Sequence, residues 1–161
     1  MTTPIAQAVP TGPPAADRPQ VDPLALESQI CFALSVASRS VVAAYRPVLE
    51  PLGLTHPQYL VMLALWQGPA LALKDLATAL RLDPGTLSPL VKRLEAQGLV
   101  TRRRGSTDER TLAIALTPAG AVLRAEAESI PARMMERLGV ERDELVVLHR
   151  TMSKLIAAAE G

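Results

Sequence analysis

The sequence has few aromatic residues, one cysteine and no long apolar run, and each shortage excludes a class of protein. Only 2% of its 161 residues are aromatic, whereas 48% are apolar and 20% are charged. Ala, Leu and Val therefore supply the apolar content, which is typical of a single helix-rich globular domain. The longest apolar run, residues 59–66, is far shorter than the ~20 residues that cross a bilayer, so we expect no membrane-spanning helix and no membrane partner.

The single cysteine, Cys31, excludes an intrachain disulfide framework and fits a reducing compartment. Six of the 14 prolines lie in the first 23 residues, which have almost no apolar periodicity. We therefore expect residues 1–21 to form a flexible tail ahead of one domain over residues 22–161. The tail has no basic n-region, so we do not expect a secretory signal and place the protein in the cytoplasm.

Apolar periodicity and capping residues predict six helices. The first follows Asp22-Pro23 and is stopped by Pro47, and the second opens at a capping box formed by Thr55 and Gln58. A proline inside the fourth helix would cost a hydrogen bond, so we expect that helix to begin at Gly85 or Thr86. The expected ranges are 24 to about 45, 55 to about 67, about 73–80, 85 or 86 to 98, 117 to about 129 before a break at Ile130-Pro131, and about 141–159.

After Gly98 the period changes, and residues 99–104 and 110–116 form two short runs with alternation in the second. This pattern predicts a β-hairpin with a loop over residues 105–109. Two helices joined by a short turn and followed by a hairpin predict a winged helix-turn-helix. The expected fold is thus mainly α with a small β-hairpin wing, and its DNA-binding part is about residues 70–117.

Positive charge gathers on the fourth helix and the hairpin. The whole chain has a net charge of only +1, but residues 92–110 contain six basic and three acidic side chains, a local charge of +3. A local basic patch is typical of phosphate binding. The alternative interpretation is that these basic side chains form an ordinary solvated face of the hairpin. None of the aromatic side chains lies in this segment, which favours double-stranded DNA over RNA.

The wing carries Asp108-Glu109-Arg110, and four other segments stand out: ICFAL at 30–34, YRP at 45–47, LTHPQYL at 54–60 and LDPGTL at 82–87. Over about residues 24–123 the chain resembles the MarR family of winged-helix regulators, and the four segments are similar to its organic-hydroperoxide-sensing (OhrR-type) branch. The resemblance implies a homodimer in which the N- and C-terminal helices form the dimerisation region. It also implies that Asp108 holds Arg110 aimed into the minor groove.

The resemblance further implies a redox sensor. Cys31 matches the sensing cysteine and Tyr45 a tyrosine that binds its sulfur, while His56 stands where a second tyrosine is expected and Ser35 replaces another. Tyr45 lies ~21 Å beyond Cys31 on one straight helix, so contact between them requires antiparallel first helices in a dimer. The expected DNA-binding residues are Thr86, Ser88, Lys92, Arg93, Arg104, Asp108 and Arg110.

The sequence therefore predicts a DNA-binding repressor, without cofactor or metal, that leaves a pseudo-palindromic operator when an organic hydroperoxide oxidises Cys31. The alternative is a small, phenolic or other, ligand in a pocket beneath the first two helices, with Cys31 structural. A thiol peroxidase is disfavoured because the chain has no second cysteine to regenerate the first. Tyr59 and Trp66 are expected in the core or as pocket walls, and His149 is expected to be structural or on the surface.

Overall fold

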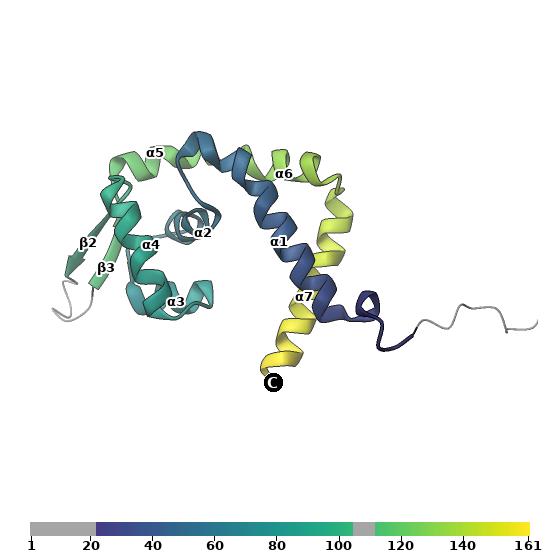
Figure 1. The fold of residues 1–161 in the computed structure, drawn as a ribbon. Helices are drawn as coiled ribbons and strands as arrows, with labels where there is room; N and C mark the ends of the chain where they lie inside the picture. Colours follow the sequence, from purple (N-terminus) through teal and green to yellow (C-terminus); the bar gives the residue numbers. More distant parts are fainter. Residues whose placement is uncertain (1–21, 105–111) are drawn as a thin grey trace, which may run out of the picture. The chain divides into compact units, whose positions relative to one another are not determined.

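The computed structural model describes residues 22–104 and 112–161, so the tail and the wing loop expected from the sequence lie outside the described residues. The described residues divide into two compact units, with the boundary between residues 37 and 38. The elements, drawn in Figure 1, are η1 (Leu26–Ser28), α1 (Ile30–Leu49), η2 (Glu50–Leu52), α2 (His56–Leu65), β1 (Leu71–Ala72), α3 (Leu73–Leu80), α4 (Pro84–Ala96), β2 (Val100–Arg104), β3 (Leu112–Leu116), α5 (Pro118–Ala127), α6 (Ile130–Leu138) and α7 (Arg142–Glu160).

Helix α1 differs from the expectation at both ends, because it begins at Ile30 and ends at Leu49. Asp22 does not cap it. Instead, Asp22 Oδ1 accepts a hydrogen bond of 2.9 Å from the Leu24 N–H, and a 3₁₀ turn follows. Pro47 lies in the last turn of α1, where its missing N–H removes one backbone hydrogen bond near the end of the helix. The prediction that Pro47 stops the helix is therefore wrong, because α1 continues to Leu49.

Helix α2 begins with the predicted capping box. The Gln58 N–H donates to Thr55 Oγ1, and the Thr55 N–H donates to Gln58 Oε1 at 2.9 Å. Each side chain thus satisfies a backbone donor that has no partner within the helix. Helix α3, which follows strand β1, has the bounds predicted from its apolar pattern.

Helix α4 begins at Pro84, one or two residues before the predicted start. Asp83 caps it by accepting a hydrogen bond of 2.9 Å from the Thr86 N–H, and Pro84 occupies the first turn, where no intrahelical donor is needed. Pro89 consequently lies inside the helix. The Asp83 cap fixes the start of α4 even though this places a proline inside the helix. Pro89 costs the helix a single backbone hydrogen bond. Gly98 has a φ of +74° and ends α4 as predicted.

The core of the second unit is apolar and joins α1, α2, α3, α4, the sheet and α6. Tyr59 is 3% exposed, which confirms its predicted core position, and burying an aliphatic side chain of this core stabilises the fold by roughly 1.5–3 kcal/mol. On α4 the inward face consists of Leu87, Val91 and Leu94, which are buried, with Leu90 half-buried beside them. The largest fully buried side chains are Leu49, Val61, Met62, Leu65, Leu76, Leu87, Val91, Leu94, Val100, Ile114 and Ile130.

The predicted hairpin is present as an antiparallel pair in which Val100 lies opposite Leu116 and Arg104 opposite Leu112. A third strand, β1, was not predicted. It pairs with β3 through Leu71 and Ile114 and gives the sheet the order β1-β3-β2. Two residues are too few to show a periodic pattern. In Figure 1 the hairpin lies beside α4, and α2 and α3 lie on the other side of that helix.

Helix α5 packs closely on the start of the hairpin. A Cβ added at Gly120 would lie 2.0 Å from the Leu99 carbonyl oxygen, and Trp66 Nε1 donates to the Gly120 carbonyl oxygen at 2.9 Å. The break between helices lies at Glu128 and Ser129, just before the predicted position, and Ile130 and Pro131 instead open α6, which the sequence did not indicate. Pro131 fits there because it lies in the first helical turn. Helix α7 agrees with its predicted range to within a residue. Within the described ranges, no helix is long and apolar enough to cross a membrane.

Candidate nucleic-acid interface and sensor residues

The outer face of α4 presents the residues predicted to meet DNA. Lys92 and Arg93 are exposed, and Ser88 is half-buried beside the inward-facing Leu87. Thr86 is exposed at the first turn, where its Oγ1 donates to Asp83 Oδ2 at 2.5 Å. Hydrogen bonds from the Thr86 side chain and backbone hold the pKa of Asp83 below its usual value. The cap therefore remains a carboxylate, and it fixes the end of α4 that carries Ser88.

Helix α4 is tied to the wing by an ion pair that sequence reasoning missed. Arg102 Nε donates to Glu95 Oε2 at 2.6 Å, and the Arg102 backbone N–H donates to Glu95 Oε1 at 3.3 Å. These contacts lower the pKa of Glu95. A charge-assisted pair with two donors on one residue fixes both distance and orientation. Arg102 is thus held by α4, and it contributes less to the open basic surface than the sequence count suggested.

The rest of the basic wing is only partly described. Arg103 is exposed on β2. The backbone of β2 extends to Arg104, but the side chain of Arg104, together with Asp108 and Arg110, lies outside the described residues. The structure therefore brings Lys92 and Arg93 onto one helix beside β2, and the predicted minor-groove contact stays a prediction.

The sensor residues fall in both units. Cys31 is exposed on α1 in the first unit, whereas Tyr45 and His56 belong to the second. The rings of Tyr45 and His56 lie 4.9 Å apart between centroids, and the Tyr59 ring lies 6.0 Å from that of Tyr45. Burial raises the pKa of Tyr45 and lowers the pKa of His56. Tyr45 is therefore a neutral hydroxyl donor at neutral pH, and the neutral form of His56 is favoured.

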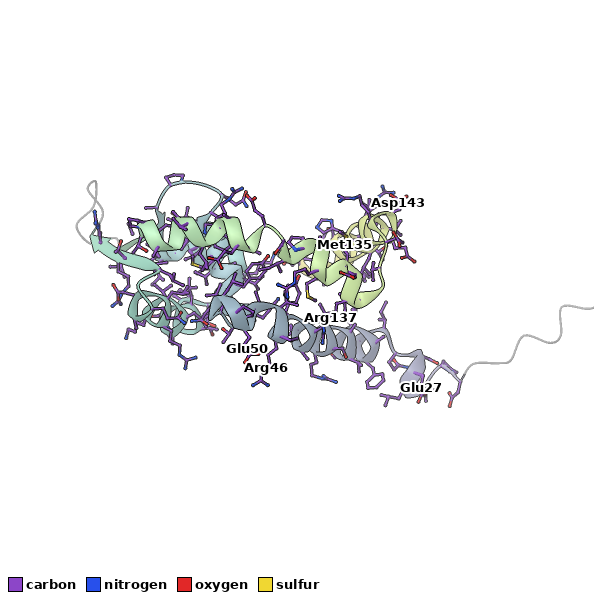
Figure 2. All side chains as sticks on the ribbon, turned by 90° about the horizontal axis from the view of Figure 1, so that it is seen from above. Glu27, Arg46, Glu50, Met135, Arg137 and Asp143 are labelled. Atoms are coloured by element: carbon purple, nitrogen blue, oxygen red, sulfur yellow. The ribbon has the colours of Figure 1, made fainter. Side chains whose placement is uncertain are left out.

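Two hollows in the second unit adjoin these rings. One, of about 600 Å³, lies between the end of α1 and the start of α2 and is lined by His56, Arg46 and Glu50 among others. Figure 2 shows Arg46 of α1 and Glu50 of η2 pointing outward, away from α6. The other, of about 690 Å³, is lined by Tyr45 and by largely apolar side chains of α6 and α7, including Met134 and Leu145. His149, on α7, is exposed.

Comparison with known proteins shows the family to which the chain is similar. A family model described as "MarR family" matches residues 54–112. The chain is 45% identical over 114 residues to the organic hydroperoxide resistance transcriptional regulator of Bacillus subtilis. The aligned residues cover 71% of this chain and 78% of that protein. Its fold is similar to reduced AbfR of Staphylococcus epidermidis bound to DNA, with a TM-score of 0.72, 32% identity and coverage of 84% and 95% of the two chains.

A second solved structure is CouR of Rhodococcus jostii RHA1 bound to a 23-mer DNA duplex, with a TM-score of 0.76, 26% identity and coverage of 85% and 99%. AbfR has also been solved overoxidised on DNA and with a disulfide formed, and CouR with p-coumaroyl-CoA. The helices, the wing and the basic face define a winged helix-turn-helix DNA-binding protein. The chain belongs to the MarR family of transcriptional regulators, and it is a regulator rather than an enzyme.

Proposed function

We propose that this regulator is a homodimeric repressor that leaves a pseudo-palindromic operator when an organic hydroperoxide oxidises Cys31. The observation that carries the proposal is the exposure of this single thiol on α1, the helix that also carries Tyr45. The similarity to a hydroperoxide resistance regulator supports the choice of oxidant. We further propose a cytoplasmic location and a DNA-binding part of about residues 70–117.

The exposed apolar side chains support a dimer. Helix α1 exposes Ile30, Phe32 and Leu34 around Cys31, and α7 exposes a further apolar set. Exposed apolar patches of this kind mark interfaces between proteins. Pairing of two copies through α1 and α7 would cover them and bring Tyr45 of one subunit to Cys31 of the other. The α7 set is Leu145, Val146, Val147, Leu148, Leu155 and Ile156.

The first step of the switch needs only the Cys31 thiol and the oxidant. The Cys31 thiolate attacks a peroxide oxygen, an S–O bond forms as the O–O bond breaks, and the leaving alkoxide takes a proton to become an alcohol. The Tyr45 hydroxyl stabilises the thiolate by donating a hydrogen bond to it, since the raised pKa of Tyr45 keeps the hydroxyl protonated. With no second cysteine in the chain, the sulfenic acid passes to a mixed disulfide with a small thiol or to overoxidation.

Oxidation acts on DNA by moving the two binding helices. Lys92 and Arg93 bind phosphates, Ser88 and Thr86 lie toward the bases, and Arg110, held by Asp108, enters the minor groove with Arg104 beside it. A bulky or charged sulfur adduct between packed helices changes the spacing of the two α4 helices in the dimer. The fit to both half-sites is then lost.

The test is a gel shift on the upstream region of the protein's own gene, with organic hydroperoxide and then with reductant. We expect the wild type to be released by hydroperoxide. Cys31→Ser should bind with unchanged affinity and ignore the oxidant, because the hydroxyl cannot be oxidised in this way. Ser40→Ala, an exposed change on the same helix, is the matched control and should respond like the wild type. Release of Cys31→Ser by hydroperoxide would refute thiol sensing.

A second candidate is release by a small ligand, with Cys31 structural. The two hollows beside Tyr45 and His56, and the binding of p-coumaroyl-CoA by CouR, favour it. A phenolic compound that raises the melting temperature and releases both the wild type and Cys31→Ser would support this candidate over oxidation.

A further inference from the structure

Gln58 is the one buried polar side chain within residues 22–104 and 112–161, with 4% of its surface exposed. A buried amide is tolerated only when its polar atoms are satisfied. The Gln58 Oε1 accepts from the Thr55 N–H and from Thr55 Oγ1, both at 2.9 Å. Its Nε2 donates to Gln97 Oε1 at 3.0 Å. The capping box explains the first two bonds but not the third.

Gln97 continues this chain of hydrogen bonds back to the same loop. Its Nε2 donates to the Gly53 carbonyl oxygen at 2.9 Å. The amides of Gln58 and Gln97 therefore hold the loop from Gly53 to Thr55 at both ends. We call these two side chains the amide relay. They come from different elements, since Gln58 lies in the first turn of α2 and Gln97 is the C-cap of α4.

One end of the amide relay lies next to the Tyr45–His56 pair, and the other lies where α4 meets the wing. Thr55 is followed directly by His56, whose ring packs on Tyr45. Gln97 is followed by Gly98, with a φ of +74°, and then by strand β2 of the wing. The relay thus runs from the backbone next to the Tyr45–His56 pair to the point where α4 meets the wing.

Other contacts between α2 and α4 cannot do the same work. Both helices contribute apolar side chains to the common core, among them Val61 of α2 and Leu87 and Val91 of α4, and apolar packing is not directional. Hydrogen bonds specify both distance and orientation. A displacement of the loop at residues 53–55 is therefore carried to the end of α4 most directly by the relay.

We propose that Gln97 is a positioning residue that couples the Tyr45–His56 pair to α4 and the wing. The inference rests on the proposed function, because the relay transmits a displacement only if oxidation at Cys31 alters the packing around Tyr45 and His56. Gln97 touches neither the oxidant nor the thiol. It sets how far the DNA-binding elements follow the change at the sensor.

The test measures the ratio of operator affinities of the reduced and the oxidised protein, with the extent of Cys31 oxidation followed by mass spectrometry. For the wild type we expect a ratio of at least about tenfold, within the usual range of allosteric coupling. Gln97→Ala should lower that ratio to about twofold or less while Cys31 is oxidised as before. A merely structural loss would weaken both affinities alike and leave the ratio unchanged.

Gln97→Ala leaves the buried Gln58 amide without its acceptor, so a second variant guards against failure to fold. Gln97→Glu keeps an acceptor for Gln58 Nε2 but has no donor for the Gly53 carbonyl, and it should lower the ratio too. Gln67→Ala, an exposed change beyond the end of α2, is the matched control and should keep the wild-type ratio. A wild-type ratio in either folded Gln97 variant overturns the coupling role alone. A wild type whose affinity ignores oxidation overturns the proposed function, and the coupling role with it.

Discussion

His56, the first residue of α2, has its ionisation altered by the fold. Burial lowers its pKa from the ordinary value of 6.5. The Tyr45 ring lies against it, and the charged side chains that line the same hollow are Arg46 and Glu50. In the folded state the imidazole therefore binds its proton less readily than in the unfolded chain.

This difference predicts an acid-sensitive stability. Between pH 6.5 and the lowered pKa of His56, the unfolded state holds more protons than the folded state, so stability falls as the pH falls through that window. His56→Gln should remove this part of the pH dependence. Urea midpoints measured across the window check the prediction.

His149→Gln is the matched control, because His149 is exposed on α7 and its replacement should leave the pH dependence of the wild type in place. If His56→Gln and the wild type lose stability in parallel on acidification, burial of His56 is not the cause.

At the scale of elements, the sequence predicts correctly those features that depend on residues close together in the chain. The bounds of α3 follow from apolar spacing, and the capping box at Thr55 follows from two residues three positions apart. The predicted ends of α1 are wrong because they rest on the prolines at 23 and 47, whereas the fold tolerates Pro47 in the last turn of the helix. Strand β1 exists only because β3 offers it a partner.

The contacts that link elements had no sequence signal. Glu95 and Arg102 are seven residues apart across the end of a helix, and Gln58 and Gln97 are 39 apart. Tyr45 and His56 were singled out by resemblance, but their contact within one chain depends on how α1 packs on α2. Residue type and spacing identify candidates, and only the tertiary fold pairs them.

The Glu95–Arg102 pair gives a prediction for the wing as an element. In the proposed homodimer, Glu95→Gln frees one guanidinium per subunit, which should strengthen binding to any duplex, because each additional phosphate contact releases counterions. It also loosens the wing against α4, so discrimination between the operator and a scrambled duplex should fall by about fivefold. Fluorescence anisotropy with both duplexes at matched salt measures the two effects separately.

Glu128→Gln serves as the control, since it removes the same charge from the exposed Arg124–Glu128 pair, joined at 2.8 Å on α5. It should leave discrimination unchanged. Equal discrimination by the Glu95 and Glu128 variants would show that the ion pair at α4 does not position the wing.

For the whole molecule, the charge distribution matters more than the total. A net charge of +1 gives little long-range attraction to DNA, so affinity must come from the local basic surface of α4 and the wing. In the proposed homodimer that surface is present twice. Each neutralised phosphate steepens the fall of log affinity with log salt by ~0.9, so a residue that binds one phosphate per subunit accounts for a slope of ~1.8.

We therefore expect Lys92→Ala and Arg93→Ala each to make the salt dependence shallower by ~1.8 and to weaken all sequences alike. Ser88→Ala should keep the wild-type slope and instead relax the preference for a base in each half-site, because it carries no charge to a phosphate. Lys154→Ala, an exposed lysine of α7, controls for the loss of one positive charge elsewhere and should not change the slope. Titrations of the operator duplex over a range of salt concentrations give these slopes directly. A change near ~0.9 would mean that only one subunit contacts a phosphate through that residue, and no change would contradict the assignment of α4 as the DNA-binding helix.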